Sequence, residues 1–401
     1  MTGSVAIVGA SLAGLSALRA LRACGFRGHI TLIGEEPHLP YDRPALSKEF
    51  LHSGEPLPLL EDHSEATELD AEWLLGRRAI GLTTCPHTIH LDDGRTVTAD
   101  TVILATGARP RRLSTFPEAH YLRSLDDARQ LRENLTGTTH LAVAGAGFIG
   151  AEIASSAQAM GVQVTLVDPS PTPGAHALGP VVAAACNALH AHHGVRLRTG
   201  VSIATHIPAT THPVPTPGMV RLTDGTTLRA DTLLVGIGST PNTEWAVPPS
   251  GNPSPPEPWC TTTGFATDTL CRTTTPGIYA IGDCAHSPDP LTARPTRTEH
   301  WTAATTQARL AAAIITGTPA PAPTAPYFWS RQYGKLLQLA GNPHAAGNVR
   351  LLEGSYEAPS FTVLYERAGV PVAVFALDNP RLFTRHRKQL DRTLRSDLEI
   401  A

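Results

Sequence analysis

Short apolar runs and helix-like patterns alternate along most of this chain. Five runs have the length of buried strands, and they lie at 5–8, 29–33, 101–104, 141–144 and 162–167. Apolar residues at helical spacing follow the first and the fourth run, and further helical patterns lie at 120–136 and 301–315. Buried parallel strands joined by helical crossovers produce this alternation. The pattern therefore predicts an α/β fold.

Two further stretches are predicted to form short strands. They lie at 73–103 and 195–230. Each contains an Asp-Gly pair, Asp93-Gly94 in the first and Asp224-Gly225 in the second. Asp-Gly between apolar strands is typical of a tight hairpin turn, so one hairpin is expected in each stretch.

The pattern changes in the last part of the chain. Residues 246–258 are rich in proline and predict an irregular loop, while 318–326 alternate proline with small residues and predict a linker. Alternating apolar residues then predict strands at 335–340, 347–353 and 360–376. A basic helical segment is expected to follow the last of these strands.

Two glycine-rich turns each separate a predicted strand from a predicted helix. The first comprises Gly9, Ala10, Ser11 and Gly14, and the second comprises Gly145, Gly147 and Gly150. In such turns the first glycine permits the bend, the second lets backbone N–H groups approach a diphosphate, and the third lets the helix pack on the strand. A ribose-binding acid follows about 20 residues later, Glu35 or Glu36 in the first case and Asp168 in the second. Two dinucleotide sites are therefore predicted, although serine replaces the middle glycine at Ser11.

Composition narrows the class of protein. A chain of 401 residues suggests two or three domains, and a net charge of −3 argues against nucleic acid or a membrane surface as partner. No apolar run approaches the roughly 20 residues that span a bilayer, and the N-terminus has no secretory pattern. Six cysteines form no C-x-x-C pair or metal cluster, so no metal site is predicted. A cytoplasmic protein is expected.

Further motifs give the chain a family resemblance. They are Pro40-Tyr41-Asp42-Arg43-Pro44-Ala45-Leu46-Ser47-Lys48, Leu122-Arg123-Ser124-Leu125-Asp126-Asp127, Leu233–Gly238 with Pro241 and Asn242, and Thr274–Asp283. With these motifs the chain resembles the FAD-dependent NADH:ferredoxin reductases of oxygenase systems, a branch of the glutathione-reductase-like flavoproteins. The resemblance covers nearly the whole chain and is poor at 246–270. It implies two Rossmann-like dinucleotide-binding domains and an α+β C-terminal interface domain.

The resemblance also implies domain boundaries. The FAD-binding domain would comprise 1–110 and 234–320, with the NAD-binding domain inserted at 111–233 and the interface domain at 321–401. The residues expected to bind FAD are Gly9, Ala10, Ser11, Gly14, Glu35, Arg43, Lys48, Ala79, Thr106, Gly107, Arg111, Arg123, Asp283, His300, Trp301 and Trp329. Those expected to bind NAD are Gly145, Gly147, Phe148, Ile149, Gly150, Asp168 and Gly238.

Two residues are expected to take part in catalysis. The resemblance places Lys48 beside flavin N5 and Glu152 beside the nicotinamide, where the two side chains can pair. An ammonium near N5 would stabilise the charge that forms on hydride transfer, and the carboxylate would hold the ammonium. Asp168 is expected to favour NADH, because a carboxylate binds a free 2′-hydroxyl and repels the 2′-phosphate of NADPH.

The function implied is reduction of FAD by NADH, followed by one-electron transfers to an iron–sulfur ferredoxin. The ferredoxin would supply an oxygenase, either a cytochrome monooxygenase or a ring-hydroxylating dioxygenase. Disulfide reductases of the superfamily need a cysteine pair beside the flavin, which this chain lacks. A rubredoxin reductase, an NADH oxidase or diaphorase, and a redox-sensing interaction protein like apoptosis-inducing factor are the alternatives.

Basic residues are candidates for docking an acidic ferredoxin. They are Arg294, Arg297, Arg331, Lys335, Arg381, Arg385, His386, Arg387 and Lys388. Opposite charge would speed the encounter and make it depend on salt. A solvated helix face is the alternative for the C-terminal run, and the chain is expected to be a monomer or a homodimer.

Overall fold

The structure is a computed structural model of the chain. It describes residues 3–60, 63–209, 216–246, 258–289 and 292–400. The proline-rich segment predicted as an irregular loop at 246–258 lies, apart from its two end residues, outside the described residues.

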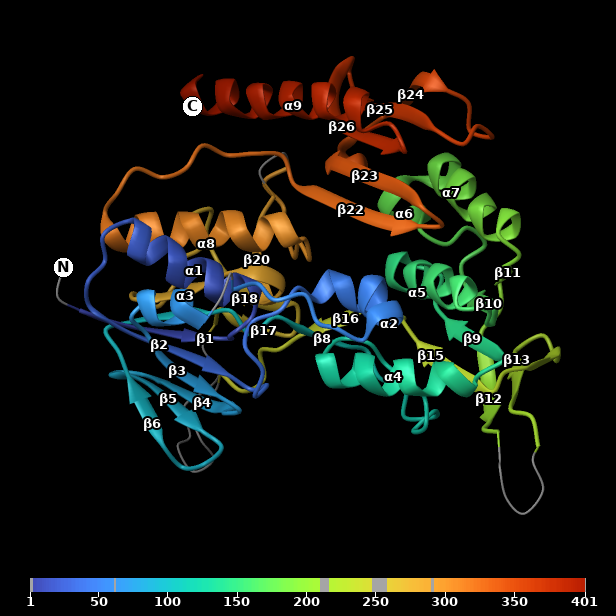
Figure 1. Ribbon diagram of the computed structural model, residues 1–401. Helices are drawn as coiled ribbons and strands as arrows, with labels where there is room; N and C mark the ends of the chain where they lie inside the picture. Colours follow the sequence, from blue (N-terminus) through green and yellow to red (C-terminus); the bar gives the residue numbers. More distant parts are fainter. Residues whose placement is uncertain (1–2, 61–62, 210–215, 247–257, 290–291, 401) are drawn as a thin grey trace.

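A five-stranded parallel sheet contains the strand that leads into the first glycine turn (Figure 1). Its strands, in spatial order, are β19 (Ile278–Ala280), β7 (Thr101–Leu104), β1 (Ser4–Val8), β2 (His29–Gly34) and β3 (Glu72–Leu75). The strands predicted at 5–8, 29–33 and 101–104 are confirmed. Because β19 comes from late in the chain, this first sheet is completed only after the chain has passed through a second one.

Two helices lie side by side on one face of the first sheet, α1 (Leu12–Ala23) and α8 (Trp301–Thr316). Helix α1 buries leucines at the helical spacing Leu15, Leu18 and Leu21. Helix α8 faces them with small residues, among them Ala308 and Ala312. Small side chains at the crossing let the two helix axes approach closely.

The second sheet is also parallel and carries the second glycine turn. Its strands, in spatial order, are β11 (Arg196–Thr199), β10 (Gln163–Asp168), β9 (His140–Ala144) and β15 (Thr232–Val235). Its helices are α4 (Leu125–Gly137), α5 (Phe148–Ala159), α6 (Ala175–Leu178) and α7 (Pro180–His192). Helix α4 starts at a capping box, because Ser124 accepts from the Asp127 N–H and the Asp127 carboxylate accepts from the Ser124 N–H.

Each parallel sheet and its helices form one unit, the first unit around the first sheet and the second unit around the second sheet. Short strands, most of them paired antiparallel, complete both units. One three-stranded set comprises β4 (Ala79–Thr84), β5 (His87–Leu91) and β6 (Thr96–Thr98), and another comprises β12 (Ile203–Ile207), β13 (Met219–Leu222) and β14 (Thr227–Arg229). Both predicted hairpins are confirmed, and Gly94 and Gly225 each have a φ of +85° at the turn. The remaining strands are β8 (Ala108–Pro110), β16 (Ser239–Pro241), β17 (Cys260–Thr261), β18 (Gly264–Ala266), β20 (Ala285–Pro288) and β21 (Pro295–Thr296).

Short helices lie at η1 (Arg43–Ser47), α2 (Glu49–Ser53), α3 (His63–Glu68), η2 (Gly282–Cys284) and η3 (Pro343–Ala345).

The last part of the chain forms an antiparallel five-stranded sheet with a helix across it (Figure 1). In spatial order it comprises β22 (Tyr327–Gln332), β23 (Lys335–Gly341), β26 (Val370–Leu377), β25 (Phe361–Arg367) and β24 (Asn348–Gly354), followed in sequence by α9 (Pro380–Ile400). The stretch predicted as one strand at 360–376 contains two strands, which are separated by a turn at Ala368-Gly369, where both residues have positive φ. This C-terminal sheet packs its apolar side chains against α6 and α7. Among the described helices, none is both long and apolar enough to cross a membrane.

Candidate functional site

The first glycine turn requires glycine for steric reasons. Gly9 has a φ of +124°, and a Cβ there would lie 2.0 Å from the carbonyl oxygen of Ala105. A Cβ at Gly14 would lie 1.8 Å from the carbonyl oxygen of Gly9. The strand, the helix and the turn after β7 are therefore packed backbone against backbone. This packing sets the N-terminus of α1 at the carboxyl edge of the first sheet, where a diphosphate can bind.

The second turn repeats this geometry and leaves space at its middle glycine. A Cβ at Gly145 would lie 2.3 Å from the Gly236 oxygen, and one at Gly150 would lie 2.1 Å from the Gly145 oxygen. At Gly147, by contrast, no described atom outside the glycine and its two chain neighbours lies within 4 Å of the Cβ position. Asp168 braces the turn by accepting a 2.8 Å hydrogen bond from the Ala146 N–H. The open space beside Gly147, at the start of α5, fits a dinucleotide diphosphate.

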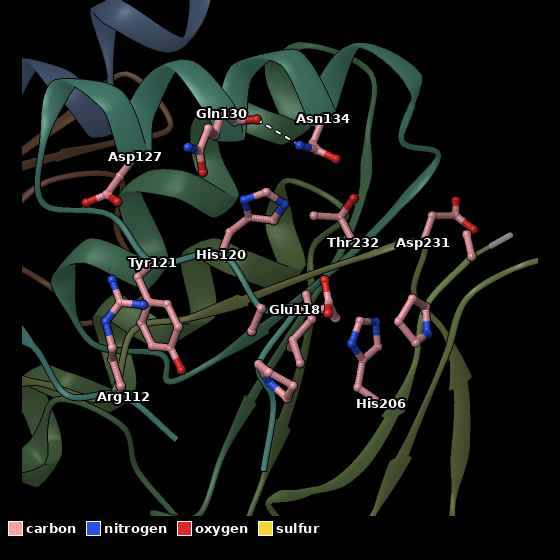
Figure 2. A pocket seen from close by; sticks show the side chains of 15 residues that line it. Arg112, Glu118, His120, Tyr121, Asp127, Gln130, Asn134, His206, Asp231 and Thr232 are labelled. Atoms are coloured by element: carbon pink, nitrogen blue, oxygen red, sulfur yellow. Dashed lines mark hydrogen bonds between the residues drawn. The ribbon is translucent and has the colours of Figure 1, made fainter. Parts of the chain in front are cut away.

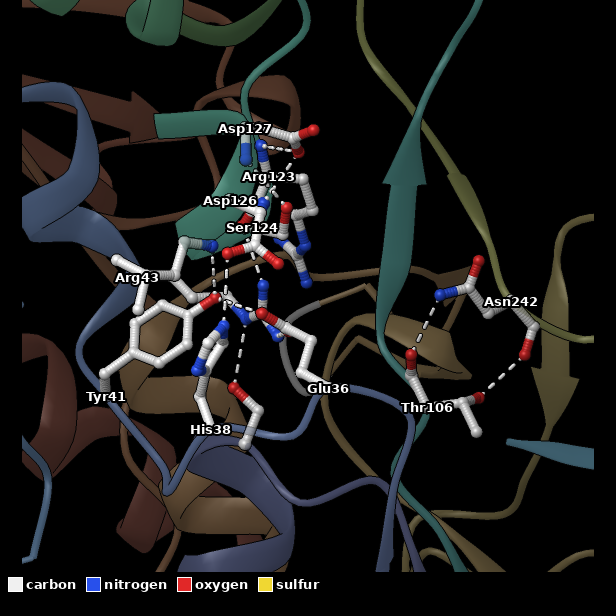
Figure 3. Close-up of polar contacts among 12 residues, drawn as sticks. Glu36, His38, Tyr41, Arg43, Thr106, Arg123, Ser124, Asp126, Asp127 and Asn242 are labelled. Carbon is white, nitrogen blue, oxygen red and sulfur yellow. Dashed lines mark hydrogen bonds and ion pairs between the residues drawn. The ribbon is translucent and has the colours of Figure 1, made fainter. Parts of the chain in front are cut away.

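Arg43 lies at the centre of a polar cluster beside the first turn (Figure 3). Its Nε donates to Ser11 Oγ at 3.0 Å, and its Nη1 donates to the Arg123 carbonyl at 2.7 Å. Its Nη2 pairs with Glu36, which also accepts from the Tyr41 hydroxyl at 2.6 Å. Burial would raise the pKa of Glu36, but Arg43 and the Tyr41 hydrogen bond outweigh it and lower that pKa. The serine that replaces the middle glycine therefore holds an arginine at the turn.

The Arg43 cluster extends to two other residues that are predicted to bind FAD, Arg123 and Asp283. Arg123 Nη2 donates to Asp283 Oδ2 at 2.9 Å, so these two side chains meet. Thr106 lies further along the same edge (Figure 3), where its Oγ1 donates to the Asn242 carbonyl at 2.7 Å and its carbonyl accepts from Asn242 Nδ2. The Ala-Thr-Gly turn is thereby fixed to the strand that returns from the second sheet.

The N-terminus of α8 carries two aromatic residues. His300 occupies the N-cap position but makes no side-chain capping hydrogen bond, and its buried Nδ1 has no partner among the described residues. Burial lowers the pKa of His300 to about 4, which keeps the imidazole neutral near pH 7. Trp301 donates from Nε1 to Asp42 Oδ1 at 3.0 Å, and its ring lies edge-on to Trp329 at a centroid distance of 6.1 Å.

The aromatic contacts continue along β22. The Tyr327 ring stacks on Trp329 at 5.6 Å, and the Arg387 guanidinium from α9 lies over Tyr327, 4.1 Å from its centroid. On the other side, Phe328 contacts Phe148 of α5, with ring centroids 4.3 Å apart. Strand β22 thus lies between α9, α8 and α5.

Lys48 and Glu152 form a buried ion pair. Lys48 follows η1, Glu152 lies on α5, and the Nζ–Oε2 distance is 2.7 Å. The glutamate is 4 % exposed and the lysine side chain 13 % exposed. Two chain segments that carry different glycine turns therefore contribute to one charged pair.

Sequence reasoning missed three residues around this pair. Ser47 Oγ donates to Glu152 Oε2 at 2.5 Å, Ser330 Oγ donates to Glu152 Oε1 at 2.7 Å, and Gln332 Nε2 donates to Ser330 Oγ. Ser47 directly precedes Lys48 in the motif from Pro40 to Lys48, and Ser330 directly follows Trp329. Their position in these motifs was the available signal, but no local pattern connects either serine with Glu152.

Other predicted residues lie apart from these contacts. Ala79 is packed in the core of the first unit beneath the sheet, whereas Glu35 and Ile149 are exposed. Arg111 donates to the Ser239 carbonyl beside Gly238. Their assignment to the cofactors stays a prediction.

A cavity of about 500 Å³ lies on the second unit, away from the contacts described so far (Figure 2). Arg112 stacks on Tyr121 at one side of it, and His120 and His206 also line it. Thr232, at the amino end of β15, borders it. Dinucleotides bind at the carboxyl ends of parallel strands, so this cavity is separate from the predicted cofactor sites.

Three of the six cysteines are buried. Burial raises the pKa of the Cys186, Cys271 and Cys284 thiols, which keeps them protonated. Cys284 is fully buried, and its thiol lies 3.3 Å from the Ile281 carbonyl oxygen. All six cysteines are free thiols in the structure.

Comparison with known proteins identifies the family. A family described as pyridine nucleotide-disulphide oxidoreductase matches residues 3–308, and one described as reductase C-terminal matches residues 327–401. Rhodocoxin reductase from Rhodococcus erythropolis is 34 % identical, over 96 % of this chain and 89 % of that protein. The ferredoxin–NAD(+) reductase component of the p-cumate 2,3-dioxygenase system from Pseudomonas putida is 35 % identical, over 90 % and 86 %.

A solved structure agrees with these matches. The crystal structure of a covalent putidaredoxin reductase–putidaredoxin complex superimposes with a TM-score of 0.89 and 32 % identity, covering 97 % of this chain and 93 % of that one. The predicted fold class is confirmed, as are the family resemblance and FAD and NAD(H) as cofactors. This chain belongs to the pyridine nucleotide-disulphide oxidoreductase family and is an FAD-dependent reductase with the family's reductase C-terminal domain.

Proposed function

We propose that this protein transfers electrons from NADH, through FAD, to an iron–sulfur ferredoxin that supplies an oxygenase. The observation that carries the proposal is the buried Lys48–Glu152 pair, which joins the segments of the two glycine turns. The names of the chain's relatives support a ferredoxin as the electron acceptor. They include a dioxygenase-system ferredoxin reductase and a putidaredoxin reductase in complex with putidaredoxin.

The two cofactors are assigned to the two turns. FAD would bind along α1 and α8, held by the first glycine turn, Arg43 and Arg123, with Asp283 at its ribityl chain. NADH would bind along α5, with Gly147 at its diphosphate. The open Cβ position at Gly147 and the neutral, unpartnered His300 nitrogen suit these two assignments. The domain boundaries given above remain part of this proposal.

The chain's own residues prepare the hydride-transfer site. FAD, when bound, accepts two electrons from NADH and releases them singly to a one-electron carrier. Lys48 supplies a positive charge where negative charge develops, in a site from which water is largely excluded. Glu152 holds that ammonium in place, and the α8 N-terminus contributes its positive dipole end.

The nicotinamide preference is assigned to Asp168. Its carboxylate ends β10 and braces the turn, where a ribose 2′-hydroxyl can donate to it. The residues that follow, Pro169 to Pro173, carry no positive charge for a 2′-phosphate. The proposed donor is therefore NADH. Electrons would pass from FAD to the acceptor without a protein thiol as carrier, because the family's dithiol route needs a cysteine pair beside the flavin, which this chain lacks.

The acceptor is proposed to dock where α9 meets β22. Arg331, Arg381, Arg385 and Lys388 are exposed there or nearby, whereas Arg297 and Lys335 are already paired with carboxylates. An acidic ferredoxin would be attracted by this charge, and its docking would weaken as salt rises. We propose a monomer or homodimer in the cytoplasm.

The test is a panel of acceptors. NADH-driven cytochrome c reduction is measured with purified ferredoxins, a rubredoxin, and no carrier, at low and high salt. Activity that depends on one ferredoxin and falls with salt is expected. Equal or higher activity with rubredoxin, or fast oxygen consumption without a carrier, would contradict the proposal. NADH-dependent dimerisation with negligible turnover would instead indicate a redox-sensing interaction protein.

A further inference from the structure

A serine from the C-terminal sheet contacts the Lys48–Glu152 pair directly. Ser330 lies on β22, has no exposed surface, and donates to Glu152 Oε1 at 2.7 Å. Gln332 Nε2 donates to the same hydroxyl at 3.1 Å. An amide nitrogen can only donate, so the Ser330 hydroxyl accepts from Gln332 and directs its own proton at Glu152.

The Glu152 carboxylate is held from both sides. Oε2 accepts from Lys48 Nζ and from Ser47 Oγ, and Oε1 accepts from Ser330 Oγ. The terminal torsion of a glutamate is soft and has no sharp rotamer. The orientation of this carboxylate therefore depends on donors from other segments, and Ser330 supplies the only hydrogen bond described for Oε1.

We propose that Ser330 is a positioning residue for hydride transfer. It fixes the plane of the Glu152 carboxylate and, through Oε2, the position of the Lys48 ammonium. This inference rests on the proposed role of the pair. Its consequence is that the C-terminal sheet forms part of the hydride-transfer site as well as packing against it.

The chain offers a matched control on the same two elements. Ser155 also lies on α5, and its Oγ accepts from the Tyr333 N–H at the end of β22, at 2.7 Å. This bond joins the same helix to the end of the same strand but does not touch the ion pair. Each of Ser155→Ala and Ser330→Ala therefore removes a hydrogen bond between α5 and the β22 segment, and only Ser330→Ala changes the surroundings of Glu152.

The experiment combines both variants with Glu152→Ala. Flavin reduction by NADH is followed by stopped flow, and thermal midpoints are measured for the same proteins at equal FAD content. Ser330→Ala is expected to slow reduction at least about tenfold, the low end of what a hydrogen bond to a charged acceptor is worth. Its KM for NADH should not change. Ser155→Ala should reduce at the wild-type rate.

The Glu152→Ala background separates positioning from packing. There, Ser330→Ala is expected to cause no further slowing and a smaller drop in thermal midpoint than in the wild type. Equal slowing in both backgrounds, or equal rates for Ser330→Ala and Ser155→Ala, would overturn the inference. If Ser330→Ala does not fold, Ser330→Cys is used, whose thiol is larger than the hydroxyl and a weaker donor, and it should give an intermediate rate; a wild-type rate would overturn the inference. A wild type that reduces its flavin but serves no ferredoxin would refute the proposed function alone.

Discussion

Replacing Lys48 with methionine tests the ion pair as a source of stability. Methionine keeps much of the lysine's length and removes its charge. Glu152, 4 % exposed, would retain only the Ser47 and Ser330 hydroxyls as donors. Leaving a buried charge without its ionic partner costs about 3–5 kcal/mol. Because two donors remain, we expect a loss near the low end, about 3 kcal/mol.

Changing both partners should cost less than changing the lysine alone. Glu152→Gln removes the carboxylate charge but leaves an amide oxygen that can accept from Lys48 Nζ, so about 1 kcal/mol is expected for this single variant. In Lys48→Met/Glu152→Gln no buried charge is left unpaired. The double variant should therefore be about 1–2 kcal/mol more stable than Lys48→Met. The coupling between the two changes is then about 2–3 kcal/mol, within the range for residues in contact.

Thermal midpoints of the FAD-saturated proteins give the test. The expected order, from high to low, is wild type, Glu152→Gln, the double variant, then Lys48→Met. Lys335→Met is the control, because the Lys335–Asp378 pair is more exposed and such pairs contribute little. A double variant that melts below Lys48→Met would refute the reasoning, since the two losses would then simply add.

Three further results are expected. Gly147→Ala should fold and bind FAD but weaken NADH binding, while Gly150→Ala should fail to fold, because its Cβ would lie 2.1 Å from a carbonyl oxygen; equal yields of the two proteins would contradict this. Asp168→Ser should raise the KM for NADH and lower that for NADPH, and unchanged values for both would remove Asp168 from cofactor selection. Burial lowers the pKa of His190 to about 4, so the folded protein binds this proton less readily than the unfolded chain. Stability from this group is complete above about pH 6.5 and falls as the pH drops from 6.5 towards 4, and thermal midpoints of His190→Asn should fall less over that window.

The sequence predicted most of the fold because its signals are local. Buried runs give the parallel strands, Asp-Gly pairs give the hairpins, and glycine spacing gives the two turns. Glycine is required at Gly9 and Gly145 because a Cβ there would meet backbone oxygens of residues that follow strands distant in sequence. The glycine spacing that predicts the two turns is nevertheless local. The pattern of 360–376 predicts one strand because its apolar residues continue across the turn at Ala368-Gly369.

The site was less predictable because its contacts are long-range. Lys48 and Glu152 were expected to pair only from a family resemblance, since 104 positions separate them. Ser330 is a further 178 positions from Glu152, and a lone serine in a strand carries no signal of its own. Glu36 and Glu35 are neighbours in sequence, and only the structure distinguishes the one that binds Arg43 from the one that is exposed.

The order of strands in the first sheet also affects how the chain folds during synthesis. Strand β19, which covers the outer side of β7, begins at Ile278, whereas β7 ends at Leu104. At about 5–20 residues per second, the intervening chain takes roughly 10–35 seconds to be made. Throughout that interval the edge of β7 that will pair with β19 has unpaired backbone N–H and C=O groups, on a strand whose side chains are buried in the finished fold. Such an edge favours association with other chains. The second sheet, β9 to β15, is synthesised complete within the same interval, so an arrested chain that ends before Ile278 would hold a folded second unit beside an aggregation-prone first one.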